Sequence, residues 1–92
     1  MPTPIKHADA AIVRACEQVA HRLAGARADA GLTQEQVAQA IGLSRPSVAN
    51  FENGRQDLPL SHLLAYIRVT GADPSRIIQP VDLWPVNVGG AA

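Results

Sequence analysis

The sequence predicts an all-α fold of five helices, with a long first helix and an irregular C-terminal tail. Apolar residues recur at spacings of three and four, as they do along one face of a helix. Glycines and prolines stand between these apolar runs, where helices stop or start. Of the 92 residues 47% are hydrophobic, yet only Phe51, Tyr66 and Trp84 are aromatic. The core is therefore expected to be aliphatic, which suits closely packed helices.

The first predicted helix spans Ala8–Ala28 and follows a polar arm, residues 1–7, that contains two prolines. Its apolar stripe is expected to consist of Ile12, Cys16, Val19 and Leu23. Cys16 is the single cysteine of the chain, so no internal disulfide can form. We expect Cys16 to be a small buried hydrophobic residue on this helix.

Two short helices are predicted next, separated by Gly42. Thr33 starts a Thr-Gln-Glu-Gln capping box and is the predicted N-cap of the first of them. Ser44 is the predicted N-cap of the second helix, Arg45–Asn53. Pro46 falls in the first turn of that helix, where its missing N–H costs nothing.

Two further helices and a tail complete the predicted organisation. The apolar face of the fourth helix, which ends near Gly71, is expected to comprise Leu60, Leu63, Leu64 and Ile67. Asp73 is the predicted N-cap of a short fifth helix, Pro74–Ile78. Residues 79–92 are interrupted by proline and contain Trp84, and they form the predicted tail. A single domain, residues 8–78, thus lies between the arm and the tail.

Two short helices joined by a tight turn predict a helix-turn-helix at residues 33–53. In the DNA-binding use of this motif, the second helix enters the major groove with its N-terminal residues at base edges. The positions of this helix that face outward are Ser44, Arg45, Pro46, Ser47, Asn50 and Asn53. Eight basic and eight acidic residues balance to zero net charge. This balance argues against indiscriminate nucleic-acid binding but permits sequence-specific binding, which depends on the local arrangement of charge.

The segment Leu32–Arg55, LTQEQVAQAIGLSRPSVANFENGR, resembles the Xre/Cro family of phage-type repressors. The resemblance extends from Leu23 through Ile78. It implies a compact, lambda-repressor-like DNA-binding domain of five helices that is usually dimeric and acts at an operator.

The resemblance also implies roles for individual side chains. Four residues are expected to contact bases: Arg45, Pro46, Ser47 and Asn50. Arg45 is the first candidate among them, because its guanidinium fork suits guanine O6 and N7. Four residues are expected to contact the phosphate backbone, which positions the protein without reading sequence: Gln34, Ser44, Asn53 and Arg55. Arg27 and Glu52 match an arginine and a glutamate that pair within the fold, so their expected role is structural.

We therefore expect a sequence-specific transcriptional regulator, a repressor that binds double-stranded DNA as a homodimer on a palindromic operator. The alternative is an antitoxin or adaptor that binds a protein partner such as a toxin through its terminal extensions, with or without promoter binding. The first helix and the tail are both candidates for the dimer interface. A tail that folds back on its own monomer also stays open.

No enzyme is predicted. His7, His21 and His62 are far apart in the sequence and offer neither a metal-ligand spacing nor a Ser/His/Asp order. No metal or other cofactor is expected. No stretch approaches the roughly 18 apolar residues that span a membrane, and the N-terminus lacks the apolar core of a signal peptide. The expected location is the cytoplasm.

Overall fold

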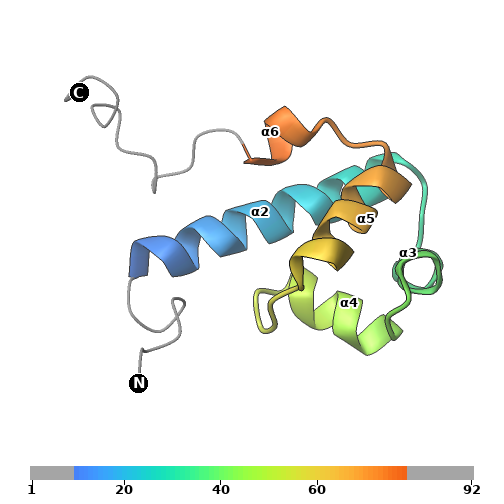
Figure 1. The fold of residues 1–92 in the computed structure, drawn as a ribbon, viewed down its shortest axis with the longest axis horizontal. Coiled ribbons are helices and arrows are strands. Elements are labelled where there is room, and N and C mark those ends of the chain that lie inside the picture. Colours follow the sequence, from blue (N-terminus) through green and yellow to red (C-terminus); the bar gives the residue numbers. More distant parts are fainter. Residues whose placement is uncertain (1–9, 79–92) are drawn as a thin grey trace.

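The computed structural model describes residues 10–78, which form five helices and no strand (Figure 1). The helices, in chain order, are α2 (Ala10–Asp29), α3 (Gln34–Ile41), α4 (Arg45–Glu52), α5 (Leu60–Thr70) and α6 (Pro74–Ile78). The predicted all-α fold with a long first helix is confirmed. The predicted arm and the predicted tail with Trp84 lie outside the described residues.

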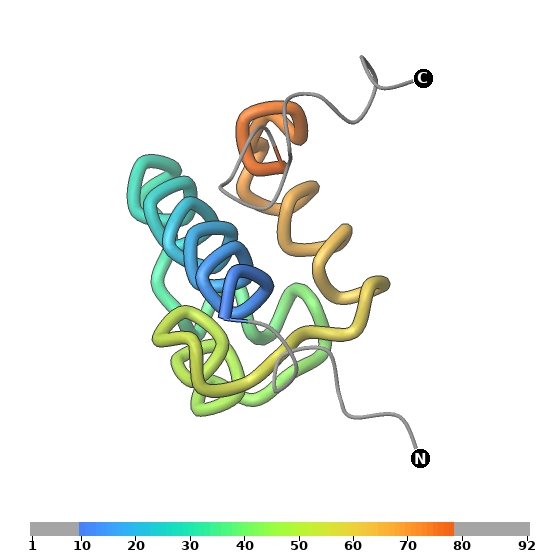
Figure 2. Tube along the Cα trace, turned by 90° about the vertical axis from the view of Figure 1, so that its left-hand side faces the viewer, coloured from blue at the N-terminus to red at the C-terminus, as the bar shows by residue number. Residues whose placement is uncertain are grey.

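Helices α4, α5 and α6 pack against α2, the longest helix, and α3 packs against α4 and α5. Helices α3 and α4 lie on one side of α2, and α6 lies on the other (Figure 1). Figure 2 shows α2 and α5 side by side, with α4 below them and α6 above. No helix among residues 10–78 has the length and apolar content needed to cross a membrane.

The core lies where α2, α3, α4 and α5 meet. Its four largest fully buried side chains are Leu23, Val37, Val48 and Tyr66. The remaining buried members of this cluster are Ala20, Ala38, Ile41, Phe51, Ile67 and Ile77. The core is aliphatic apart from one aromatic pair, Phe51 and Tyr66, whose ring centroids lie 6.0 Å apart.

The predicted helix starts are confirmed by their hydrogen bonds. The Thr33 hydroxyl accepts from the backbone N–H of Gln36 at 3.0 Å, and the Gln36 side-chain oxygen accepts from the backbone N–H of Thr33 at 2.8 Å. This reciprocal pair satisfies two N–H groups that the first turn of α3 would leave unpaired. The Ser44 hydroxyl accepts in the same way from the backbone N–H of Ser47 at the start of α4.

The predicted stripe of α2 is wrong at Cys16. The Cys16 side chain is exposed, whereas its neighbour Ala15 is only 5% exposed. The observed stripe runs through Ala15, Val19, Ala20 and Leu23. Val19 and Leu23 belong to both the predicted and the observed stripe, so the buried face keeps its direction and the difference is confined to residues 15 and 16.

The predicted apolar face of α5 is wrong at two of its four positions. Leu60 is 69% exposed and Leu64 is 57% exposed. Tyr66 is fully buried instead, together with Ile67, and Leu63 is partly buried against them. Residues 63, 66, 67 and 70 share one face of the helix, and residue 64 lies about 160° around the helix from residue 66. Burial of Tyr66 therefore turns Leu64 towards solvent, whereas Leu60 is the first residue of α5 and is exposed at the start of the helix.

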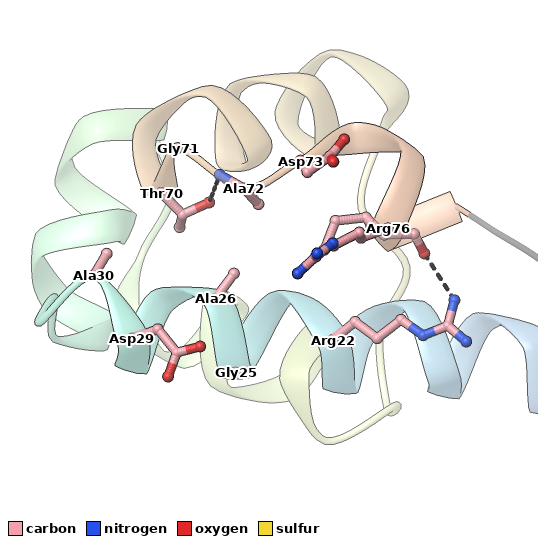
Figure 3. A pocket seen from close by; sticks show the side chains of 11 residues that line it. Arg22, Gly25, Ala26, Asp29, Ala30, Thr70, Gly71, Ala72, Asp73 and Arg76 are labelled. Atoms are coloured by element: carbon pink, nitrogen blue, oxygen red, sulfur yellow. Dashed lines mark hydrogen bonds between the residues drawn. The ribbon is translucent and has the colours of Figure 1, made fainter.

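The contacts of helix α6 with α2 include the buried side chain of Ile77 and a hydrogen bond from Arg22. Ile77 is 4% exposed, and its carbonyl accepts a hydrogen bond from Nη1 of Arg22 at 3.2 Å. A hollow of about 580 Å³ lies between α2 and the turn that joins α5 to α6, and the Arg76 side chain extends into it (Figure 3). The residues that line the hollow come from α2 and the residue after it, from the end of α5 and its following turn, and from α6, and none comes from α3 or α4, so the hollow does not belong to the helix-turn-helix.

The contribution of a buried leucine to stability can be compared with that of an exposed one. Leu23→Ala removes a fully buried side chain, and we expect it to lower the free energy of unfolding by about 2–5 kcal/mol. Leu64→Ala is the matched control, since its exposed side chain should change that free energy by less than about 0.5 kcal/mol. Chemical denaturation followed by circular dichroism gives both values. Equal losses would contradict the observed rotation of α5.

Candidate nucleic-acid interface

A tight turn at Gly42 sets the angle between α3 and α4. Gly42 adopts φ = 79°, in the left-handed region that side chains other than glycine rarely enter. The backbone N–H groups of Gly42 and Leu43 both donate to the carbonyl of Ala38, which closes the end of α3. Val48 of α4 and Ala38 of α3 are fully buried in the core. The two short helices are thus fixed relative to one another by backbone and side chain together.

The first turn of α4 is exposed, and it carries three of the four predicted base-contacting residues. Arg45 and Pro46 are exposed, and Ser47 is partly exposed. The Ser44 hydroxyl donates to the Ser47 hydroxyl at 3.0 Å, so the hydrogen of the Ser47 hydroxyl can be donated outward. Asn50, the fourth residue, follows Ser47 by three positions and is partly exposed.

The end of α4 carries two of the predicted phosphate-contacting residues. Asn53 caps the helix, and its backbone N–H donates to the carbonyl of Ala49. Arg55 follows two residues later, and its backbone N–H donates to the carbonyl of Asn50 at 2.8 Å. Both side chains are exposed. Among the described residues, the guanidinium groups of Arg45 and Arg55 make no hydrogen bond or ion pair, so both can meet an external ligand.

The Glu52 carboxylate connects α4 to three other helices. It accepts from Nε and Nη2 of Arg27 on α2, at 2.8 and 3.0 Å, in a two-bonded ion pair. It also accepts from Nε2 of Gln34 on α3 at 3.0 Å and from the hydroxyl of Tyr66 on α5. The Glu52 side chain is 5% exposed, and that of Arg27 is 18% exposed. A nearly buried charge with this set of donors is fully compensated.

These contacts shift the pKa values of the residues that make them. Burial by itself would raise the pKa of Glu52, but the hydrogen bonds from Arg27, Tyr66 and Gln34 outweigh it and lower that pKa. The hydrogen bond to Glu52 raises the pKa of Arg27. Burial, together with the hydrogen bond to Glu52, raises the pKa of the Tyr66 phenol. All three residues therefore keep their ordinary charge states at neutral pH.

Tyr66 is the member of this cluster that sequence reasoning missed. The apolar spacing of the fourth predicted helix was fitted to leucines and isoleucine, which left the tyrosine off the buried face. One signal was present in the chain: a buried tyrosine needs a partner for its hydroxyl, and Glu52 is a carboxylate assigned to the interior. Gln34, predicted to contact phosphate, uses one amide N–H on Glu52 and keeps a second N–H to donate elsewhere.

The structure distributes the predicted site residues along α3 and α4. Gln34 lies in the first turn of α3, Ser44 to Ser47 form the start of α4, and Arg55 follows its end. Within residues 10–78, no group of three or more His, Cys, Asp or Glu side chains is placed to hold a metal ion.

Two short helices, a glycine turn and an exposed first turn on the second helix together define a helix-turn-helix domain. The chain belongs to the helix-turn-helix domain family, whose sequence profile matches residues 18–77. The family resemblance of the segment Leu32–Arg55 is thereby confirmed. The matched range contains all of α3, α4 and α5.

One solved structure with a similar fold is that of the clp gene regulator ClgR from C. glutamicum. Its TM-score is 0.65, at 23% sequence identity over 84% of this chain and 87% of that chain. The likeness is one of fold. A comparison with curated protein sequences finds no match.

The charge state of Glu52 makes stability depend on acid pH. The pKa of Glu52 lies below its ordinary value of 4.5 in the folded protein, so the unfolded chain takes up the proton first. Its stabilising effect is present above about pH 4.5 and is lost as the pH falls through the lowered pKa. We expect Glu52→Gln to be less stable than the wild type at pH 7 and to lose less stability towards acid pH.

Urea unfolding between pH 7 and pH 3 measures this dependence. Glu35→Gln is the matched control, because Glu35 is an exposed carboxylate on α3. It should keep the wild-type stability at pH 7 and the wild-type loss towards acid. Identical pH profiles for Glu52→Gln and the wild type would contradict the role assigned to the buried carboxylate.

Proposed function

We propose that this protein is a sequence-specific DNA-binding transcriptional regulator, a repressor that acts as a homodimer on a palindromic operator. The observation that carries the proposal is the exposed first turn of α4 on a tightly packed helix-turn-helix, with an unengaged arginine at its first position. Such a turn is the part of the motif that meets base edges in the major groove. We also propose the cytoplasm as the location of the protein.

The first two turns of α4 supply the chemistry for reading bases. Arg45 can donate two parallel hydrogen bonds to guanine O6 and N7, and Asn50 can pair with adenine N6 and N7. The Ser47 hydroxyl can donate to a base acceptor. The ring of Pro46 has no N–H to donate, but it can pack on a thymine methyl group.

Phosphate contacts on both sides of the base-reading turn would fix the register of the helix in the groove. We assign these contacts to Gln34, Ser44, Asn53 and Arg55. The second amide N–H of Gln34 and the guanidinium of Arg55 are the strongest donors among them. Because Gln34 is also bonded to Glu52, a phosphate held there would be tied directly to the end of α4.

The charge balance favours selective binding to a specific site over tight binding to DNA of any sequence. The chain has no net charge, and Arg27 and Arg22 are committed to bonds within the fold. Few cations are therefore left to displace counterions from DNA, and the affinity for random sequence should be low. Specific contacts to bases have to supply most of the difference between an operator and other DNA.

Binding to the DNA upstream of the protein's own gene tests the proposal. We expect binding that weakens with added salt and survives an excess of random-sequence competitor, with a footprint of two symmetric half-sites. Fluorescence anisotropy at several salt concentrations, followed by footprinting, gives these results. Binding no tighter than to random DNA would contradict the proposal and favour a protein-binding role, such as that of an antitoxin.

Substitutions of Arg45 on α4 and of Arg55 in the loop that follows it should impair DNA binding in different ways. Arg45→Ala should lower the discrimination between operator and random DNA by about 1–3 kcal/mol, because it removes a base contact. Arg55→Ala is the matched comparison, since it removes a phosphate contact and should weaken binding to both DNAs alike. It should also reduce the salt dependence by about one unit of slope. Retained specificity in Arg45→Ala would contradict its assignment.

A further inference from the structure

The turn that follows α4 contains an asparagine-glycine pair, Asn53 and Gly54. Both residues are exposed, and they lie where the chain leaves α4 on its way to α5 (Figure 1). Within residues 10–78, the side-chain amide of Asn53 makes no hydrogen bond, although its backbone caps the helix. Asparagine is a chemically labile residue, and the group that attacks its side chain is the backbone nitrogen of the next residue. Glycine presents this nitrogen with no side chain to hinder it.

We propose that Asn53 is a deamidation site and that the fold controls its reaction. The backbone nitrogen of Gly54 gives up its proton to a base and attacks Cγ of Asn53, which closes a five-membered succinimide ring. The Cγ–Nδ2 bond breaks, and the side-chain nitrogen takes up a proton and leaves as ammonia. Water then opens the ring. Cleavage at Cγ yields aspartate, and cleavage at the backbone carbonyl yields isoaspartate, whose main chain runs through Cγ.

The observed backbone of the turn keeps this ring from closing. Asn53 adopts φ = −89° and ψ = 4°, in the bridge region of backbone conformation. A ψ near zero places the Gly54 nitrogen on the same side as the backbone nitrogen of Asn53, and therefore away from Cβ of Asn53. Ring closure requires the Gly54 nitrogen to lie alongside Cβ, within reach of Cγ. Asn53 must leave its observed conformation before it can react.

Two backbone hydrogen bonds hold the unreactive conformation. The N–H of Gly54 donates to the carbonyl of Phe51 at 3.0 Å, and the N–H of Arg55 donates to the carbonyl of Asn50 at 2.8 Å. Rotation about ψ of Asn53 moves both donors away from their acceptors, so both bonds break. The bonds lie at an exposed helix end, where local opening costs less than opening of the core. The reaction therefore proceeds through the opened turn.

The buried cluster around Glu52 limits this opening. Glu52 immediately precedes Asn53, and its carboxylate accepts hydrogen bonds from Arg27, Gln34 and Tyr66. These bonds hold the last turn of α4 from the inside of the protein. Opening that extends back from the turn into the helix has to break them. Removal of one donor should consequently raise the population of the opened turn.

Deamidation changes the charge at a position assigned to phosphate contact, and this consequence rests on the proposed function. The amide of Asn53 can donate to a phosphate oxygen, whereas a carboxylate has no hydrogen to donate and is repelled by the phosphate. Isoaspartate also lengthens the main chain by one carbon atom just before Arg55. Both products should lower the affinity for DNA of any sequence. Neither product returns to asparagine spontaneously, so the protein would lose activity permanently with age.

Bound DNA should slow the reaction. The phosphate contacts proposed for Asn53 and Arg55 engage the side-chain amide and hold the closed turn. A copy that occupies its operator is therefore expected to age more slowly than a free copy. The inference thus links the lifetime of the regulator to its occupancy of DNA.

Incubation of the full chain without DNA at mildly alkaline pH tests the chemistry. Peptide mass spectrometry should show conversion of Asn53 to aspartate and isoaspartate, at least about tenfold more slowly in the folded protein than in guanidinium chloride. Asn50 is the matched control in the same molecule, because it lies inside α4 and precedes Phe51, whose side chain hinders the attacking nitrogen. Absence of conversion in the folded protein, conversion of Asn50 at the same rate, or equal rates in folded and unfolded protein would overturn the inference.

A variant of the buried cluster tests the control by the fold. Tyr66→Phe removes one donor to Glu52 and should raise the rate of conversion in the folded protein about three- to tenfold. Its rate in guanidinium chloride should equal that of the wild type. Leu64→Ala is the matched control on the same helix, since Leu64 is 57% exposed, and it should change neither rate. Equal rates for folded Tyr66→Phe and folded wild type would overturn this control.

DNA binding tests the consequence separately. Asn53→Asp should bind operator and random DNA about tenfold more weakly than the wild type, and Asn53→Ala, which adds no charge, should lose less. An operator duplex present during incubation should slow the conversion of Asn53, and a scrambled duplex should not. Equal conversion with and without bound operator would overturn the protection by DNA. A chain that binds no DNA but converts Asn53 as described would remove the proposed function and keep the deamidation site.

Discussion

The Glu52 carboxylate accepts hydrogen bonds from three side chains that belong to three different helices. A charge that is 5% exposed cannot be left partly unpaired, so the positions of Arg27, Gln34 and Tyr66 are set by it together. In this way a single side chain of α4 orients α2, α3 and α5 around that helix. The packing of Val48 and Phe51 then fills the space between the same helices with apolar side chains. Polar geometry and apolar packing therefore specify one arrangement.

This constraint explains which parts of the fold the sequence could reveal. The starts of α3 and α4 depend on local bonds between residues three apart, and Thr33 and Ser44 therefore predicted them correctly. Gly42 predicted the turn for the same reason, since only its own backbone conformation was at issue. The rotation of α5 depends on a bond between Tyr66 and a residue 14 positions away, and apolar spacing contains no information about such a bond. Leu60 and Leu64 were assigned to the core because a leucine pattern fits two adjacent faces of a helix equally well.

In the candidate site too, features that depend on local sequence were predicted and features that depend on distant residues were not. Exposure at the first turn of α4 follows from the helical position of Arg45 and Pro46, and the structure agrees with it. The pairing of Arg27 with Glu52 came from family resemblance, because a separation of 25 residues gives no local signal. Gln34 was assigned to phosphate alone, although one of its amide hydrogens is used inside the fold. Side chains that serve both the interior and the surface are the ones that a linear pattern describes least well.

The division of labour along α4 also bears on how new DNA specificities can arise by mutation. The side chains at positions 45, 47 and 50 are not members of the buried cluster, so substitutions there should change base preference with little effect on the fold. Position 52, two residues further along the same helix, is tied to three partners and tolerates little change. Divergence among descendants of this chain should consequently concentrate in the first two turns of the helix. The last turn of α4, which contains Glu52, should vary least.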